Sequence, residues 1–239
     1  MNGVFITGTD TDAGKTVVSS LIVESLVRAG LKVSGLKPIA SGFDVIDGQW
    51  VNSDVASLTQ ASNVSLPSER INRYAFKPAI APHIAAQNAG LTLSFDAISQ
   101  DLAFAQARSD FVLVEGVGGW HVPLESCGAS LNRPIKDIES LALSLKLPVV
   151  MVVGLRLGCL NHAVLTAKAI IASGAPLLGW VANHVDPQFD HVGDNLDSLE
   201  ALLPIPKLFE VPYLDEKNVL DTGEIDASDF IKSIVQKDE

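Results

Sequence analysis

The sequence predicts an α/β fold in which helices cover both faces of a mostly parallel β-sheet. Short apolar runs recur along the chain, segments with helical periodicity lie between most of them, and a glycine-bearing loop joins the first run to the first helix. The expected strands are residues 4–7, 33–36, 111–114, 149–153, 180–182 and 207–211. The expected helices are residues 16–29, 53–60, 82–88, 95–107, 138–145, 160–173 and 195–203.

The individual elements follow from their composition and their boundaries. The strand candidates are continuous apolar runs, which is typical of parallel strands buried on both faces. Gly30 and Gly174 follow two of the helical segments, and Ser94 precedes a third as an N-cap. Residues 43–52 and 122–134 contain no clear period and are predicted to be loops.

Composition limits the class of protein. The 239 residues are 47% hydrophobic, enough for one large core, and we expect a single domain over residues 1–239. The best apolar stretch, residues 141–153, is interrupted by Lys146 and Pro148, so a soluble protein is expected. The N-terminus lacks the basic region of a signal peptide, which favours a cytoplasmic location.

Charge and cysteine content narrow the expected partners. The formal net charge of −11 disfavours nonspecific binding to nucleic acid or to anionic membranes, and neither is expected as a partner. Cys127 and Cys159 are too few for a disulfide framework, so reduced thiols are expected. An anionic ligand must therefore be held by a local site.

Residues 8–16, GTDTDAGKT, stand between the first strand and the first helix and predict a phosphate-binding loop. Glycines allow backbone N–H groups to converge on phosphate oxygens, and the helix N-terminus adds its positive end. Lys15 would reach the β and γ phosphates, and Thr16 would offer its hydroxyl to Mg²⁺. Five residues separate Gly8 from Gly14, where the usual pattern has about four. An ordinary strand-to-helix turn is the alternative.

Polar residues also follow the other expected strands. Lys37 and Ser41 follow the second, Glu115 ends the third, residues 154–161 follow the fourth and Asn183 ends the fifth. Because ligands bind beyond the carboxyl ends of parallel strands, these residues are expected at one edge of the sheet. Lys37 follows a buried strand, and a second cation there would offset charge that grows during phosphoryl transfer; a surface lysine is the open alternative.

Carboxylates supply the expected metal site. Glu115 ends an apolar strand, as in many phosphate-loop proteins that hold Mg²⁺, and Gly116 and Gly118 after it let the backbone approach a ligand. Asp54 is a second candidate, although an aspartate in a first helical turn also offsets the helix dipole.

Seven strings, in order along residues 4–214, resemble the dethiobiotin synthetase family: GTDTDAGKT, KPIASG, NSD, APH, VEGVGGW, GCLNH and GWVAN. The resemblance covers the lengthened phosphate loop, and it implies a phosphate-loop NTPase-like fold. It implies an ATP- and Mg²⁺-dependent ligase that joins 7,8-diaminononanoate and CO₂ into dethiobiotin during biotin biosynthesis. A carbamate and a carbamic-phosphoric anhydride would be intermediates, and ADP and phosphate would be released. The resemblance also implies a homodimer.

The resemblance further implies roles for individual residues. Thr11, Lys15, Lys37 and Ser41 would surround the carbamate and the γ phosphate, and Thr16, Asp54 and Glu115 would arrange Mg²⁺. The ATP site would comprise Asp12, Ala13, Gly14, Lys15, Thr16, Val17, Asp54, Glu115, Gly116, Val117, Gly118, Asn183, His184, Pro212, Tyr213 and Leu214. The substrate would also contact Cys159, Leu160 and Asn161 from the partner subunit, unless that turn is only a helix cap, and His83 and Trp120 would shape the pocket. His184 and Tyr213 depart from the family pattern near the base.

Two other functions compete with this interpretation. A nucleotide-driven partitioning or assembly switch would share the phosphate loop, but the chain lacks a basic or amphipathic segment for DNA or membrane. An amide-forming synthetase would need an ammonia source, and the sequence contains no recognisable glutaminase domain.

Overall fold

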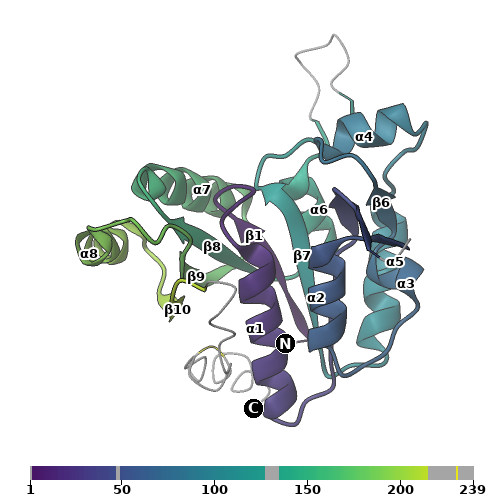
Figure 1. Ribbon diagram of the computed structural model, residues 1–239, viewed down its shortest axis with the longest axis horizontal. Helices are drawn as coiled ribbons and strands as arrows, with labels where there is room; N and C mark the ends of the chain where they lie inside the picture. The colour runs from purple at the N-terminus through teal and green to yellow at the C-terminus, as the bar shows by residue number, and fades with distance from the viewer. Residues whose placement is uncertain (1, 47–48, 127–134, 215–229, 231–239) are drawn as a thin grey trace.

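A computed structural model describes residues 2–46, 49–126, 135–214 and 230 of the chain. Its main sheet has six parallel strands in the order β10-β9-β8-β1-β7-β2 (Figure 1). The predicted parallel sheet is therefore confirmed. The strands are β1 (Gly3–Gly8), β2 (Val33–Leu36), β7 (Phe111–Gly119), β8 (Val149–Leu155), β9 (Leu177–His184) and β10 (Lys207–Val211).

Helices cover both faces of this sheet, as the sequence predicts. Helices α1 and α2 lie on one face, and α5, α6, α7 and α8 supply apolar side chains to the core on the other (Figure 1). No helix within the described ranges is long and apolar enough to cross a bilayer. The helices are α1 (Lys15–Arg28), α2 (Ser53–Ala61), α3 (Ser68–Ile71), α4 (Pro82–Asn88), α5 (Phe95–Gln106), α6 (Ile138–Leu145), α7 (Cys159–Ser173) and α8 (Val192–Leu202).

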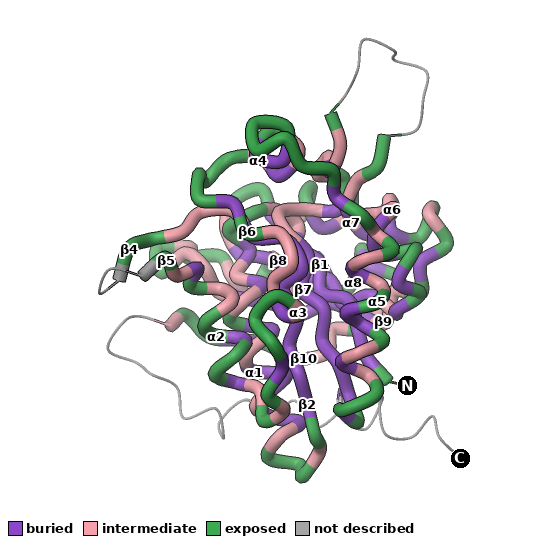
Figure 2. The backbone as a smooth tube through the Cα atoms, turned by 90° about the vertical axis from the view of Figure 1, so that its right-hand side faces the viewer, coloured by how far each residue is buried: buried purple, intermediate pink, exposed green. Residues whose placement is uncertain are grey.

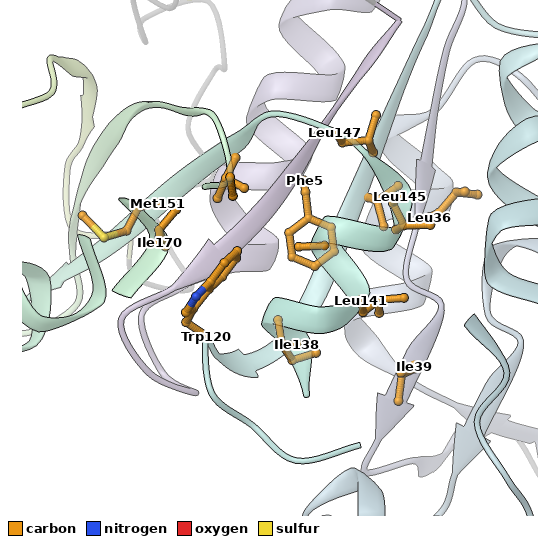
Figure 3. Packing of buried hydrophobic residues seen from close by; sticks show 14 of the residues in the cluster. Phe5, Leu36, Ile39, Trp120, Ile138, Leu141, Leu145, Leu147, Met151 and Ile170 are labelled. Atoms are coloured by element: carbon orange, nitrogen blue, oxygen red, sulfur yellow. The ribbon is translucent and has the colours of Figure 1, made fainter. Parts of the chain in front are cut away.

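The buried apolar side chains form two clusters, one on each face of the sheet, because successive side chains of a strand point to opposite faces. Val4 and Ile6 of β1 join the cluster that contains the buried face of α1, whereas Phe5 between them joins the cluster on the opposite face. In Figure 3 the Phe5 ring lies near Leu141 of α6. The strands form the buried centre of the molecule (Figure 2), so the first residues beyond them have a rigid base.

Several element boundaries differ from the prediction. Strand β7 continues through Glu115 to Gly119, and α8 begins at Val192, three residues before the predicted start. The predicted loop at 43–52 is wrong, because β4 (Asp44–Ile46) and β5 (Gln49–Val51) form an antiparallel hairpin there. In the other predicted loop, Pro123 bridges to Asp137, while residues 127–134, including Cys127, lie outside the described residues.

A second small sheet also was not predicted. Strands β3 (Ile39–Ser41) and β6 (Tyr74–Phe76) pair in parallel, apart from the main sheet. This pairing continues beyond the strands, since the N–H of Gly42 donates to the carbonyl of Phe76 at 2.9 Å. The chain that follows β6 is thereby placed beside the end of β3, close to Ser41.

The strand order places the polar strand ends together. β1 lies between β8 and β7, with α1 following it, and β2 flanks β7. The loops that follow β1 and its neighbours β7 and β8 therefore lead to different sides of the sheet. Such divergence creates a crevice at the carboxyl edge of a parallel sheet. Glu115 is in register with Ile6, and Asn183 is in register with Gly154.

Candidate active site

The phosphate loop leaves β1 at Gly8 and enters α1 at Lys15. Gly14 caps the helix with a φ of 79°, a left-handed conformation that favours glycine. The Lys15 ammonium donates hydrogen bonds to the carbonyl oxygens of Asp10 (2.8 Å) and Thr11 (3.2 Å). The loop therefore surrounds the Lys15 ammonium with its own carbonyl oxygens. The N–H groups at the start of α1 are suited to binding an anion.

Asn183 braces the loop from β9. Its side-chain amide donates to the carbonyl oxygen of Ala13 at 2.9 Å, and only 4% of the residue is exposed. A Cβ atom added to Gly14 would lie 2.0 Å from the Asn183 amide nitrogen. The sequence predicts Asn183 as a nucleotide-binding residue, and its contact with the loop places it at the end of the phosphate site.

A buried cluster of opposite charges adjoins the loop. The Lys37 ammonium lies 2.9 Å from Asp54 Oδ2, contacts Glu115 Oε1, and donates to the carbonyl oxygen of Gly116 at 3.2 Å. The Thr16 hydroxyl donates to the same Glu115 oxygen at 2.8 Å. Lys37 is 2% exposed, so it is not a surface lysine, and its contacts place it beside the predicted site residues Asp54 and Glu115.

Local structure holds Asp54 toward this cluster. The Asn52 side chain accepts a hydrogen bond from the N–H of Val55 and so caps α2. Asp54 then lies in the first turn of that helix and pairs with Lys37. Asp54 is therefore a first-turn acid that also contacts Lys37, and its role as a metal-site carboxylate stays a prediction.

Burial and neighbouring charge shift the pKa values in this cluster. Burial alone would lower the pKa of Lys37, but Glu115 and Asp54 outweigh it and raise that pKa. Burial would likewise raise the pKa of Asp54, but the Lys37 ammonium holds it below its usual value. Burial, reinforced by the Lys37 charge, lowers the pKa of Lys15 from 10.5 to about 8. The carboxylates of Glu115, Asp54 and Asp12 oppose this shift but do not cancel it.

Raising the pH from about 8 to 10.5 is expected to stabilise the wild-type protein relative to Lys15→Met. The folded chain releases the Lys15 proton near pH 8, whereas the unfolded chain keeps it until about 10.5, so proton loss favours the folded state in this window. Chemical denaturation across the window measures the difference, with Lys32→Met, at an exposed position, as the control. A difference that stays constant with pH would contradict the shifted pKa.

A cavity of about 740 Å³ opens beside these groups. Predicted site residues form most of its lining: Thr11, Asp12, Gly14, Lys15, Thr16, Val17, Lys37, Ser41, Asp54, Val117 and Gly118. The Ser41 hydroxyl is buried without a hydrogen-bond partner among the described residues, so it is available to a ligand. The structure therefore brings the phosphate loop, both lysines and Ser41 to one space.

Sequence reasoning assigned no site role to five residues of the lining. They are Ala79, Ile80, Ala81, Pro82 and Val122, and they form an apolar wall. The sequence does contain an apolar pair, Ala79-Ile80, in a short segment bounded by prolines. Its place beside the cavity could not be predicted, because that place depends on the pairing of β3 with β6.

Other predicted residues do not line this cavity. Ala13, Glu115, Gly116 and Asn183 are buried, and each contacts a lining residue or the phosphate loop. His184, Pro212, Tyr213 and Leu214 lie where β9 and β10 end. Cys159, Leu160 and Asn161 form the start of α7 and do not line it within the same chain. His83 lines a separate cavity of about 220 Å³, and buried Trp120 donates to Glu139 at 2.9 Å.

The donor set fits a divalent cation that is shared with phosphate. The described residues contain no group of three or more histidine, cysteine, aspartate or glutamate side chains suited to a metal ion. Two carboxylates and one hydroxyl do meet, however, and the second oxygen of Glu115 is buried without a hydrogen-bond partner. Mg²⁺ is commonly bound by one or two carboxylates together with substrate phosphates, which matches this set.

Comparisons with known proteins agree with this geometry. A family model described as an AAA domain matches residues 2–218. The chain is 44% identical over 218 residues to the ATP-dependent dethiobiotin synthetase BioD of Alteromonas mediterranea, covering 89% of this chain and 93% of that protein. It is 42% identical over 234 residues to the enzyme of the same name from Vibrio vulnificus, covering 97% and 98%.

Solved structures support the fold. The septum site-determining protein MinD of Pyrococcus horikoshii aligns with a TM-score of 0.52 and 13% identity, over 88% of this chain and 81% of its own. A ParA family ATPase from Chlorobium tepidum aligns with a TM-score of 0.53 and 14% identity, over 98% and 93%. At these identities the likeness concerns the fold alone, and it confirms the predicted phosphate-loop architecture.

Proposed function

Because this chain belongs to the ATP-dependent dethiobiotin synthetase family, we propose that its cavity closes the ureido ring of dethiobiotin from 7,8-diaminononanoate, CO₂ and ATP. The chain is an ATP-dependent ligase of biotin biosynthesis, and the resemblance seen in its motifs is confirmed. The likeness to MinD and ParA concerns the fold only, and no observation favours the alternative of a partner-driven switch.

The reaction requires three bond-forming steps. One amine of the substrate attacks CO₂ and loses a proton, which gives a carbamate. A carbamate oxygen attacks the γ phosphorus of ATP, and ADP leaves. The second amine then attacks the carbonyl carbon of this mixed anhydride, loses a proton and expels phosphate. No step needs a covalent bond to the protein, so the site has to position the reactants and balance their charge.

The observation that carries this proposal is that two buried ammonium groups, Lys15 and Lys37, reach one cavity beside the phosphate loop. We assign Lys15 to the β and γ phosphates. We assign Lys37, with Thr11 and Ser41, to the carbamate and the transferred phosphoryl group. Negative charge grows where these lysines stand, and preorganised cations are most effective in a water-excluded site.

The nucleotide is proposed to lie along the loop toward β9 and β10. Asp12 to Val17 would surround the phosphates, with Gly116, Val117 and Gly118 on the opposite side. Asn183, His184, Pro212, Tyr213 and Leu214 would flank the base. Support comes from the register of β10 on β9, in which Val211 lies opposite Asn183, so residues 212–214 emerge beside it.

Thr16, Asp54 and Glu115 are proposed to hold Mg²⁺ together with phosphate oxygens. Bound there, the ion would neutralise phosphate charge and orient the γ phosphate. The protein's own contribution is to favour the ionised form of Asp54, since the Lys37 ammonium lowers the pKa of that carboxyl. A chelator should abolish turnover, and added Mg²⁺ should restore it.

A homodimer is proposed to complete the substrate site. The turn before α7 has no side-chain cap on its first N–H groups, and Leu157 in that turn is 89% exposed. The Cys159 N–H donates to the carbonyl of Arg156 at 3.0 Å. The other N–H groups at this helix start suit a carboxylate, such as the substrate's tail. Since Cys159, Leu160 and Asn161 do not line their own chain's cavity, we assign them to the cavity of the partner subunit.

Mixing two inactive variants tests the shared site. Lys37→Ala disables the cavity and Asn161→Asp places a negative charge at the tail turn, so each homodimer should be poorly active. A heterodimer contains one site with both defects and one intact site, and random exchange should restore about a quarter of wild-type activity. No recovery, with heterodimers shown by native mass spectrometry, would contradict a cross-subunit site.

Mass spectrometry of the product tests the function itself. The purified protein is incubated with 7,8-diaminononanoate, bicarbonate and MgATP, and each component is omitted in turn. Dethiobiotin should form only in the complete mixture. Its absence, together with ATP hydrolysis stimulated by DNA, membrane or another protein, would overturn the proposal. That the chain forms a single domain and that it acts in the cytoplasm both remain predictions.

A further inference from the structure

An ion pair outside the cavity joins Asp10 to Arg156. Asp10 lies in the phosphate loop after β1, and Arg156 directly follows the last residue of β8. These strands are parallel neighbours, so both residues leave the sheet at the same edge. The guanidinium contacts Asp10 Oδ2, and the two side chains are only partly exposed, Arg156 by 33% and Asp10 by 26%. Arg156 is not part of the cavity lining.

Asp10 is coupled to the lysine of the loop through its main chain. Its carbonyl oxygen accepts a hydrogen bond from the Lys15 ammonium at 2.8 Å. Next to it, the N–H of Thr9 donates to the carbonyl of Val152 in β8 at 3.0 Å. The end of β8 therefore contacts the loop at two points. One is the backbone hydrogen bond of Thr9, and the other is the ion pair of Arg156 with Asp10.

The charge of Asp10 requires a counter-ion. An aspartate in a loop that binds polyphosphate repels its ligand, and Asp10 Oδ1 is buried without a hydrogen-bond partner among the described residues. Removing the cation from such a pair leaves a partly buried, uncompensated carboxylate, and this costs more than the pair itself contributes. Arg156 both cancels this charge and fixes the direction of the side chain.

We propose that Arg156 is a positioning residue for nucleotide binding, which neutralises Asp10 and holds the phosphate loop in the shape that accepts a polyphosphate. The inference rests on the proposed use of this loop for ATP. It gives the turn before α7 a role in its own chain's phosphate site, in addition to its proposed role in the partner's substrate site.

Calorimetric titration with MgADP tests the proposal without any turnover. Arg156→Met is expected to raise the Kd for MgADP on the order of tenfold, and Arg156→Lys should keep most of the affinity. The informative variant is the double substitution Arg156→Met with Asp10→Asn. The double variant also lacks the ion pair, but it has no unpaired Asp10 carboxylate. It should therefore bind MgADP more tightly than Arg156→Met alone. A purely structural role would make the double variant at least as weak.

Arg73→Met is the matched control. Arg73 also pairs with an aspartate, Asp101 of α5, but neither residue lines the cavity. Arg73→Met should leave the Kd for MgADP unchanged. Circular dichroism checks that the variant is folded. A Kd for Arg156→Met within about twofold of wild type, or a double variant no tighter than the single one, would overturn the proposal. Because dethiobiotin formation is assayed separately, failure here is distinguishable from failure of the proposed reaction.

Discussion

Lys37→Ala is expected to lower kcat by about 10²- to 10³-fold. The ammonium is buried at the cavity, where phosphoryl transfer to the carbamate concentrates negative charge, and neither solvent nor another side chain replaces it. Initial rates of dethiobiotin formation at saturating MgATP measure the effect. Lys32→Ala, at an exposed position between α1 and β2, is the matched control and should keep wild-type turnover.

The same substitution has a predictable effect on stability. Without Lys37, the Glu115 and Asp54 carboxylates lose their shared counter-ion, so unfolding should require less denaturant. Rates must therefore be measured below the unfolding transition of the variant. Lys37→Arg keeps the charge and should be the more stable variant. Near-wild-type kcat in folded Lys37→Ala would remove Lys37 from the reaction.

Gly14→Ala is expected to weaken MgADP binding by about 100-fold or more, because the backbone that cradles the phosphates cannot keep its shape. The new methyl group would meet the Asn183 amide nitrogen at 2.0 Å, and a φ of 79° is itself unfavourable for alanine. Either the loop or Asn183 must move. Calorimetric titration of the variant with MgADP measures the loss.

Gly30→Ala is a control for the effect of a left-handed φ at a position outside the site. Gly30 also has a left-handed φ, 89°, but nothing lies within 4 Å of the position that its Cβ would take. Both variants should lose about 1 kcal/mol of stability from backbone strain, but only Gly14→Ala should lose affinity. Equal loss of MgADP affinity in both would contradict a local effect of Gly14→Ala on the phosphate loop.

The sequence was sufficient to predict the main sheet and the charged half of the site. Parallel strands buried on both faces require continuous apolar runs, so their positions and the polar residues at their ends are visible in the sequence. Glu115 and Lys37 could be placed at one edge because parallel strands end together. Their direct contact could not be predicted, since it depends on β2 and β7 being neighbours.

The accessory strands escaped prediction for a physical reason. β3, β4, β5 and β6 have three residues each, too short for a period to stand out. The Asp47-Gly48 pair in the sequence is a hairpin signal that was available for β4 and β5. Nothing local signals the pairing of β3 with β6, because residues distant in sequence make it.

Most of the apolar wall, residues 79–82, stands on a different part of the fold from the charged groups of the cavity, whereas Val122 follows β7 of the main sheet. Residues 79–82 follow β6 of the small sheet, whereas Lys15, Glu115 and Asp54 belong to the main sheet and to helices packed on it. Substitutions in residues 79–82 are therefore expected to change the apolar lining of the cavity without changing the charge beside the phosphate loop. In such an arrangement the apolar lining can change in evolution while the charged groups beside the phosphate loop are retained.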